Sequence, residues 1–302
     1  MPVRIGLQAC LMFENGQHSM QQQLLKIRVA TRQEFDLPLE WAAAQGWNPG
    51  WHDADCFHAA DPDGFLIGWL GDEPVATISV VRYGETFGFL GFYMVKPKYR
   101  GKGYGLQIWN AGIDRLARRN IGLDGVLDQQ ENYRKSGFSL AYRNIRYQGR
   151  NSSQLLVDSR VVPLSTIAFD ALSAYDRQLF PALRTKFLTC WIKQAQSTAL
   201  GILNKQNLVG YAVIRACRSG YKIGPLFADS AELAERLFMA LQAYVPAGSE
   251  IFMDIPEVNA SALDLVKRHH MSAIFETARM YTGTLPEIPV NRIFGVTTFE
   301  LG

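Results

Sequence analysis

Several features that would point to a particular class of protein are missing from this sequence. The four cysteines, Cys10, Cys56, Cys190 and Cys217, form no C-x-x-C pair, which argues against a zinc site and against a disulfide-dense scaffold. No apolar run reaches the roughly 18 residues of a membrane span. Lys+Arg total 31 against Asp+Glu 28, a net charge of +3, too weak a basic balance for a polyanion-binding protein. We therefore expect a cytoplasmic protein without metal, membrane or nucleic-acid partners.

A length of 302 residues predicts two domains. Residues 1–20 contain a short apolar patch but no small-residue cleavage site, so a signal peptide is not expected. We interpret residues 1–20 as a disordered extension, and a true start at Met20 stays open. The texture of the remaining sequence predicts domains at 21–150 and 155–302.

The first domain begins with a strand at 24–31 and a helix that Thr31 and Glu34 open with a capping box. Pro38 is expected to interrupt that helix, and Gly46 to end it. Residues 47–64 contain turn formers and large aromatics, which predicts a long functional loop.

A β-rich texture follows, and the second domain repeats much of the same order. Three strands within 65–95 precede an amphipathic helix, a strand at 123–127, a short helix and a strand at 138–150. Residues 155–302 again read as helices, three strands, a helix, a strand, a helix and a strand. The fold class is therefore α/β, in the α+β sense of a mixed sheet flanked by helices, and a divergent tandem copy is favoured over chance similarity.

Residues 94–106, MVKPKYRGKGYGL, are the most informative segment. A proline ends a strand, and three alternating glycines precede a helix, so backbone N–H groups and the helix N-terminus can cradle a pyrophosphate. A Walker A loop would need Ser or Thr after Lys102, where Gly103 stands. A dinucleotide fingerprint would need glycine at Leu106. An ordinary tight turn is the remaining alternative.

The stretch Arg100-Gly101-Lys102-Gly103-Tyr104-Gly105 resembles the [QR]-x-x-G-x-[GA] acyl-CoA loop of the GNAT superfamily of N-acetyltransferases. Downstream, residues 133–138, YRKSGF, match the Y-x-x-x-G-F segment on the last helix of that fold. The resemblance covers about residues 24–150. Further segments at 46–50, 121–126, 223–229, 254–259 and 278–280 resemble a tandem subgroup whose second half is a YitH-type acetyltransferase-like domain.

The resemblance implies two tandem GNAT-like domains, each a mixed, mostly antiparallel twisted sheet, and direct transfer of an acetyl group from acetyl-CoA to an amine. Strand 87–95 would bulge and splay from strand 123–127 so that the pantetheine arm can bind like an added strand. The implied cofactor residues are Tyr93, Met94, Val95, Arg100, Gly101, Lys102, Gly103, Tyr104, Gly105 and Asn132.

Tyr133 stands where family members place the acid that protonates the leaving thiolate, although packing on Phe138 is an alternative role. The general base is harder to identify, because the strand FGFLGFYMV lacks the Glu that many relatives carry there. Glu85 and Asp128 are the candidates, and the residues His52, Asp53 and Asp55 are alternatives. An acceptor amine that is already neutral would need no base.

The 47–64 loop is expected to bind the acceptor through Trp47, Asn48, Trp51 and His52, although Trp47 can equally pack the loop onto the sheet. The second half has no glycine loop, and Pro225 stands at the equivalent junction, so we expect a degenerate copy and leave a second acyl-CoA site open. The function favoured is acetylation of a small-molecule amine. A non-catalytic acyl-CoA sensor, a protein lysine or N-terminal acetyltransferase, and a homodimer stay open.

Overall fold

The computed structural model of this protein describes residues 24–151 and 158–302. The extension expected at 1–20 and the junction between the two expected domains lie outside the described residues. Within those residues, no helix is both long enough and apolar enough to cross a membrane.

The first half follows the expected order of elements closely. Its strands are β1 (Lys26–Val29), β2 (Phe65–Leu70), β3 (Glu73–Tyr83), β4 (Phe87–Val95), β5 (Asn120–Val126) and β6 (Ser139–Arg150). Its helices are α1 (Asp36–Ala44), α2 (Asp53–Ala60), α3 (Tyr104–Arg115) and α4 (Gln130–Lys135), with 3-10 turns η1 (Pro97–Tyr99) and η2 (Leu127–Gln129).

The predicted reciprocal hydrogen bonds between Thr31 and Glu34 form, but they close the turn before the first helix and do not cap it, since the N-cap of α1 is Phe35 and no side chain caps it. The proline of this helix also acts differently from the prediction. The Glu34 N–H donates to Thr31 Oγ1 at 3.2 Å, and the Thr31 N–H donates to Glu34 Oε2 at 2.9 Å. Regular helix begins only at Asp36, so Pro38 lies in the first turn of α1, where a missing N–H breaks no helical hydrogen bond.

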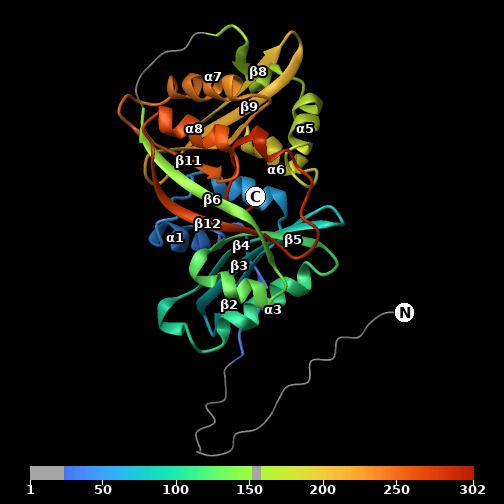
Figure 1. The fold of residues 1–302 in the computed structure, drawn as a ribbon. Coiled ribbons are helices and arrows are strands. Elements are labelled where there is room, and N and C mark those ends of the chain that lie inside the picture. The colour runs from blue at the N-terminus through green and yellow to red at the C-terminus, as the bar shows by residue number, and fades with distance from the viewer. Residues whose placement is uncertain (1–23, 152–157) are drawn as a thin grey trace, which may run out of the picture.

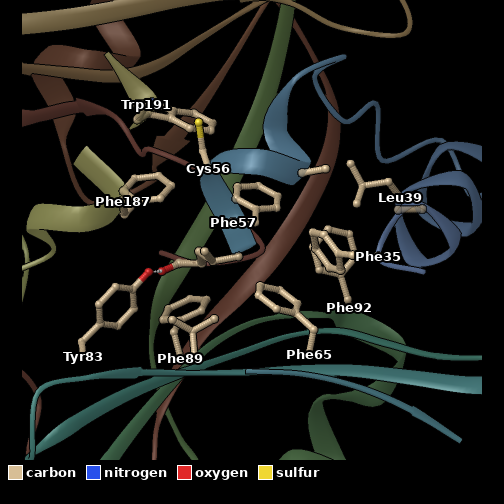
Figure 2. Close-up of a cluster of buried hydrophobic side chains, with 14 of the residues drawn as sticks. Phe35, Leu39, Cys56, Phe57, Phe65, Tyr83, Phe89, Phe92, Phe187 and Trp191 are labelled. Carbon is tan, nitrogen blue, oxygen red and sulfur yellow. Dashed lines mark hydrogen bonds between the residues drawn. The ribbon is translucent and has the colours of Figure 1, made fainter. Parts of the chain in front are cut away.

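The prediction of a continuous loop over 47–64 is wrong, because α2 forms in its middle. Cys56 and Phe57 are fully buried, and Figure 2 shows them pointing into an aromatic cluster with Phe187 and Trp191 of the second half. The rings of Phe57 and Trp191 stack with centroids 5.9 Å apart. Burial of one apolar face therefore forms a helix where the local residues indicate turns.

The second half repeats the first in its order of elements. Its strands are β7 (Val161–Pro163), β8 (Ser197–Asn204), β9 (Asn207–Ala216), β10 (Tyr221–Ala228), β11 (Glu250–Pro256), β12 (Ser272–Tyr281) and β13 (Ile293–Gly295). Its helices are α5 (Phe169–Arg177), α6 (Thr185–Trp191), α7 (Ala231–Gln242) and α8 (Ala260–Arg268), with η3 (Leu164–Thr166) and η4 (Val290–Arg292).

The two halves exchange their last strands and so share one sheet. The strand order is β1-β2-β3-β4-β5-β12-β6-β11-β10-β9-β8-β7, and β13 pairs with β10. β12 of the second half pairs with β5 of the first, and β6 of the first half pairs with β11 of the second. Among the strands of the described residues, β4–β5 and β10–β11 are the parallel pairs. Figure 1 shows β6 and β12 side by side where the halves meet.

Each exchanged strand carries a buried arginine that pairs with an aspartate on the strand it joins. Arg146 of β6 binds Asp254 of β11 through Nε at 2.6 Å and Nη2 at 2.8 Å. Arg279 of β12 binds Asp124 of β5, with Nε at 2.8 Å from Oδ1. Such bidentate pairs fix both the neighbour and the register of a strand.

Removing one partner of such a pair leaves a buried charge without compensation. We predict that Arg146→Met lowers the free energy of unfolding by about 3–5 kcal/mol. Arg143→Met is the matched control, since Arg143 lies on the same strand but is 44% exposed. Its ion pair with Glu276 is long, at 3.5 Å. The control should cost about 0–1 kcal/mol. Urea unfolding followed by circular dichroism measures both, and equal losses would contradict the prediction.

Candidate functional site

A cavity of about 760 Å³ opens between β4 and β5 and extends to the second half of the chain. The first half contributes residues of β4, β5, η2, the turn before α3, and Tyr133 of α4. The second half contributes Phe275, Glu276 and Thr277 of β12 together with Phe299 and Glu300 of the C-terminal tail, residues 293–302. The strand exchange therefore places both halves around one cavity.

The cavity exists because two parallel strands separate, as the family resemblance implies. β4 and β5 pair only from Phe87 with Asn120 to Leu90 with Leu123. Beyond Leu90, the register of β4 against β3 shifts, and Phe92 has a positive φ of 44°. The bulge and the splay are thereby confirmed. The backbone of residues 91–95 faces the cavity with groups that β5 does not pair.

The glycine turn before α3 forms an open helix N-terminus. Gly101 and Gly103 have φ of 74° and 80°, in the region that side chains disfavour, and Gly103 is the N-cap of α3. No side chain caps this end, so the first N–H groups of α3 remain available. Such an end, with its partial positive charge, suits a phosphate group.

Most of the expected cofactor residues lie together at this end of the cavity. Tyr93, Met94, Val95, Arg100, Gly101 and Gly105 line it. Lys102, Gly103 and Tyr104 belong to the same turn but are not among the lining residues. Asn132 also lies outside the lining, and its side-chain amide donates to Gln129 Oε1 at 2.8 Å. The roles of these residues stay predictions.

Tyr133 both packs in the core and lines the cavity, so its packing does not remove it from the site, and its role as an acid stays a prediction. Its ring lies 5.7 Å from that of Trp109 and 6.5 Å from that of Phe138. Gly125 of β5 makes room for the ring, because a Cβ there would lie 2.7 Å from Tyr133 Cδ2. Burial, and to a lesser extent Tyr93, raises the pKa of the Tyr133 hydroxyl above its usual range, so it is protonated at neutral pH.

Of the two expected base candidates, Asp128 lies at the cavity and Glu85 does not. Asp128 lines the cavity from η2. Glu85 does not: it lies in the β3–β4 turn, its side chain is 96% exposed, and it faces Arg119 at 3.8 Å. Its position at the opposite end of β4 from the bulge makes it a surface residue. Asp53 is also engaged elsewhere, because Arg215 of β9 donates to its carboxylate at 2.8 Å in the core.

Of the expected acceptor-binding residues, only Trp47 lines the cavity. Asn48 instead forms reciprocal hydrogen bonds of 2.9 and 2.8 Å with the backbone of Ser219, and the Trp51 N–H donates to Ala216 at 3.2 Å. His52 precedes α2 and lies outside the lining. The segment 47–52 therefore attaches to the second half, which local sequence cannot indicate.

Contacts from β6 and from the second half hold Trp47 at the cavity. The Trp47 carbonyl accepts a hydrogen bond from Arg146 Nη1 at 2.8 Å. The buried Lys222 ammonium donates to the Asn48 carbonyl at 2.9 Å. Arg146 of the exchanged strand β6 and Lys222 of β10 thus fix the backbone that carries the Trp47 side chain.

Sequence reasoning missed the cavity residues of the second half. Sequence reasoning also missed Asp124 of β5, a lining residue whose buried carboxylate accepts hydrogen bonds from Arg279 and Asn144. Glu276 and Glu300 are remote in sequence from the glycine turn, and no short motif marks them. Only knowledge of the strand exchange brings them to the site.

The equivalent cleft of the second half is filled by the chain itself. β10 and β11 pair only at Tyr221–Ile223, and β10 then shifts register against β9, as β4 does against β3. In the space that opens, β13 pairs with β10 at Leu226 and Phe227, and the Val296 N–H donates to the Asp254 carbonyl at 2.8 Å. The tail thus occupies the position that corresponds to the first cavity.

The phosphate-cradling features are also missing from that second cleft. Pro225, which has no N–H, stands beside the register shift of β10. The N-terminus of α7 is closed by Ser230, whose hydroxyl accepts from the Leu233 N–H at 3.3 Å.

Within residues 24–151 and 158–302, no group of three or more His, Cys, Asp or Glu residues gathers as a metal site would require.

Comparison with known proteins gives matches to each half and to the whole chain. A family model described as "Acetyltransferase (GNAT) family" matches residues 28–138, and one described as "Acetyltransferase (GNAT) domain" matches residues 172–295. "Holothin acyltransferase" of Pseudoalteromonas sp. (strain SANK 73390) is 32% identical over 273 residues, which are 90% of this chain and 93% of the relative.

Solved structures agree. A putative acetyltransferase from Pyrococcus horikoshii superposes with a TM-score of 0.79 at 25% identity, covering 97% of this chain and 99% of that one. A tandem GNAT protein from the clavulanic acid biosynthesis pathway gives a TM-score of 0.60 at 12% identity over 86% and 99% of the two chains. The tandem GNAT fold is confirmed, and the chain belongs to the GNAT family of acetyltransferases, whose chemistry is acyl-CoA-dependent acyl transfer.

Proposed function

We propose that this protein is a cytoplasmic N-acyltransferase that transfers an acetyl group from acetyl-CoA directly to the primary amine of a small molecule. The observation that carries the proposal is the single cavity in which an open helix N-terminus, a splayed strand and a buried tyrosine meet. The transfer takes place in the cavity of the first half.

The residues present fit an acyl-CoA along the length of the cavity. Gly101 and Gly103 leave the α3 amides open for a pyrophosphate, and Arg100 adds charge while its Nε donates to the Val95 carbonyl at 3.0 Å. The unpaired edge of β4 offers hydrogen-bond groups to a pantetheine arm. When bound, acetyl-CoA supplies an activated acyl thioester.

The chain's own groups provide polarisation and an acid. Backbone N–H groups of residues 93–95 would polarise the acyl carbonyl, and Tyr133 would donate its proton to the departing sulfur. Because burial raises the pKa of this hydroxyl, it carries its proton at neutral pH and is able to donate it. This acid favours an enzyme over a non-catalytic acyl-CoA sensor.

The acceptor end favours a small molecule over a protein tail. Trp47, Phe275, Phe299 and the carboxylates Glu276 and Glu300 surround it from both halves of the chain. An aromatic wall with nearby carboxylates suits a compact cationic amine with a flat body. The relative's name makes holothin the first acceptor to test, and its designation as an acyltransferase calls for longer acyl donors beside acetyl-CoA.

The test is a thiol-release assay with acetyl-, propionyl- and hexanoyl-CoA against holothin, a panel of small amines and a lysine-containing peptide. We expect thiol release with at least one small amine, and acylated product by mass spectrometry. Release with the peptide alone would favour a protein acetyltransferase. CoA binding without release from any acceptor would favour the sensor.

Tyr133→Phe removes the proposed acid while the ring continues to pack on Trp109. We predict that kcat falls by about 10²- to 10⁴-fold and that the Kd for CoA is unchanged. Tyr142→Phe is the control, since Tyr142 is also buried but does not line the cavity, and its turnover should be retained. Steady-state kinetics with calorimetry of CoA binding measures both, and undiminished turnover in Tyr133→Phe would assign the acid elsewhere.

Because β13 fills the second cleft, each chain should bind one CoA. Isothermal titration calorimetry should give a stoichiometry near one, and Arg100→Ala should weaken this binding by about 1.5–3 kcal/mol through the loss of a charge-assisted hydrogen bond. Lys26→Ala, on the distant edge strand β1, should leave the affinity unchanged. A stoichiometry of two, or an Arg100 variant with full affinity, would contradict this prediction.

A further inference from the structure

The proposed reaction needs a group that accepts the amine proton, and β4 offers none. Its sequence FGFLGFYMV contains no acidic residue. At the bulge the strand carries Gly91, which has no side chain to place in the cavity. The structure puts the C-terminal tail there: a Cβ added to Gly91 would overlap the Glu300 carbonyl oxygen and lie 3.0 Å from the Glu300 Cα.

Four acidic residues line the cavity, and three of them are poorly placed for this role. Asp124 is saturated, because its two oxygens accept hydrogen bonds from Arg279 Nε and Nη2, and Oδ1 also from Asn144 Nδ2 at 2.8 Å. Asp128 is exposed and lies on η2, next to the helix that carries Tyr133, on the side of the leaving sulfur.

Glu276 is 40% exposed and faces Arg143 at 3.5 Å. Water and this cation both stabilise its ionised form, which makes it a weaker proton acceptor. Glu300 is different: it is 5% exposed, it lines the cavity, and its backbone lies against the bulge of β4. The N–H groups proposed to polarise the acyl carbonyl belong to residues 93–95, the next residues of the same bulge. An amine that attacks that carbonyl therefore approaches beside Glu300.

The tail that carries Glu300 is held firmly on both sides. Before it, β13 pairs with β10 in the second cleft. After it, the Leu301 carbonyl accepts from the Tyr83 hydroxyl at 3.1 Å, the hydrogen bond drawn at Tyr83 in Figure 2, and the Gly302 carbonyl accepts from Arg184 at 3.1 Å. Fixation at both ends gives Glu300 the rigidity that a proton acceptor at a reacting centre needs.

We propose that Glu300, contributed by the second half, is the general base of the reaction in the first. The amine nitrogen forms a bond to the acyl carbon while its proton passes to the Glu300 carboxylate. The bond from that carbon to sulfur breaks, and the sulfur takes the proton of Tyr133. The products are the amide and CoA thiol, and a proton moves from Glu300 through solvent to restore Tyr133. The assignment rests on the proposed function.

The electrostatics of the position agree with this role. Burial raises the pKa of Glu300, Lys222 of β10, Arg146 of β6 and Arg215 of β9 oppose the rise, and Asp53 of α2 adds to it. The net shift is upward from the ordinary value of 4.5. A base of raised pKa binds the amine proton more strongly than an exposed glutamate would, and the nearby cations favour its ionised form.

Glu300→Gln keeps the shape of the side chain but removes the base. With the acceptor identified by thiol release, we expect kcat to fall by about 10²- to 10⁴-fold while the Kd for CoA is unchanged. Glu300→Asp should retain part of the activity. In the wild type, kcat/KM should decrease as the pH drops through the pKa of Glu300, which lies above 4.5. The pH at which this decrease occurs should stay the same when acceptors of different pKa are compared. The Glu300→Gln variant should lack this limb.

A readout without turnover uses the stability of the free protein. A carboxyl whose folded pKa is raised loses its stabilising contribution as pH rises from the unfolded value through the folded one. The Tm of Glu300→Gln relative to wild type should therefore increase as pH rises above 4.5. A constant difference would show that the carboxyl is not buried as the proposal needs, and would overturn it.

The remaining outcomes separate this proposal from the proposed function. If the wild type releases thiol and Glu300→Gln does so equally well, or if Glu276→Gln or Asp128→Asn alone removes the pH limb, Glu300 is not the base and the function stands. If the wild type releases no thiol with any acceptor, the function fails and the base assignment fails with it.

Discussion

Two buried arginine–aspartate pairs hold this structure together, because they determine which strand lies beside which. Arg146 pairs with Asp254 across 108 residues of sequence, and Arg279 with Asp124 across 155. A buried charge without its partner is costly, so strands that carry such charges accept few alternative neighbours. The exchange of β6 and β12, and with it the two-sided cavity, follows from these pairings.

The local features of the first half were predictable because they depend on neighbours in the sequence. The Thr31–Glu34 hydrogen bonds and the glycine turn at 101–105 arise within short segments, and both are present. The divergence of β4 from β5, which the family resemblance implies, is present as well. The family resemblance rested on the same segments. It held because a phosphate cradle needs a fixed spacing of residues that lack side chains.

The parts that could not be predicted are those that distant residues determine. Residues 53–60 look like part of a loop until Phe57 meets Trp191, and burial then favours a helix. Asn48 and Trp51 look like acceptor contacts until Ser219 and Ala216 bind them. Glu85, chosen for its closeness in sequence to β4, lies at the wrong end of that strand. The predictions for residues 48, 51 and 53–60 failed because these residues contact the second half, which is far away in the sequence.

The strand exchange also bears on how the protein is made. β5 can pair with β12 only after β12 has been synthesised. The first cavity lacks a wall until residues 275–277 and 299–300 have left the ribosome. Domains usually fold in order as they emerge, but contacts of such long sequence separation favour late and slow completion. A nascent first half cannot close its own sheet. A chain that stops before residues 275–277 and 299–300 would therefore lack part of the cavity wall.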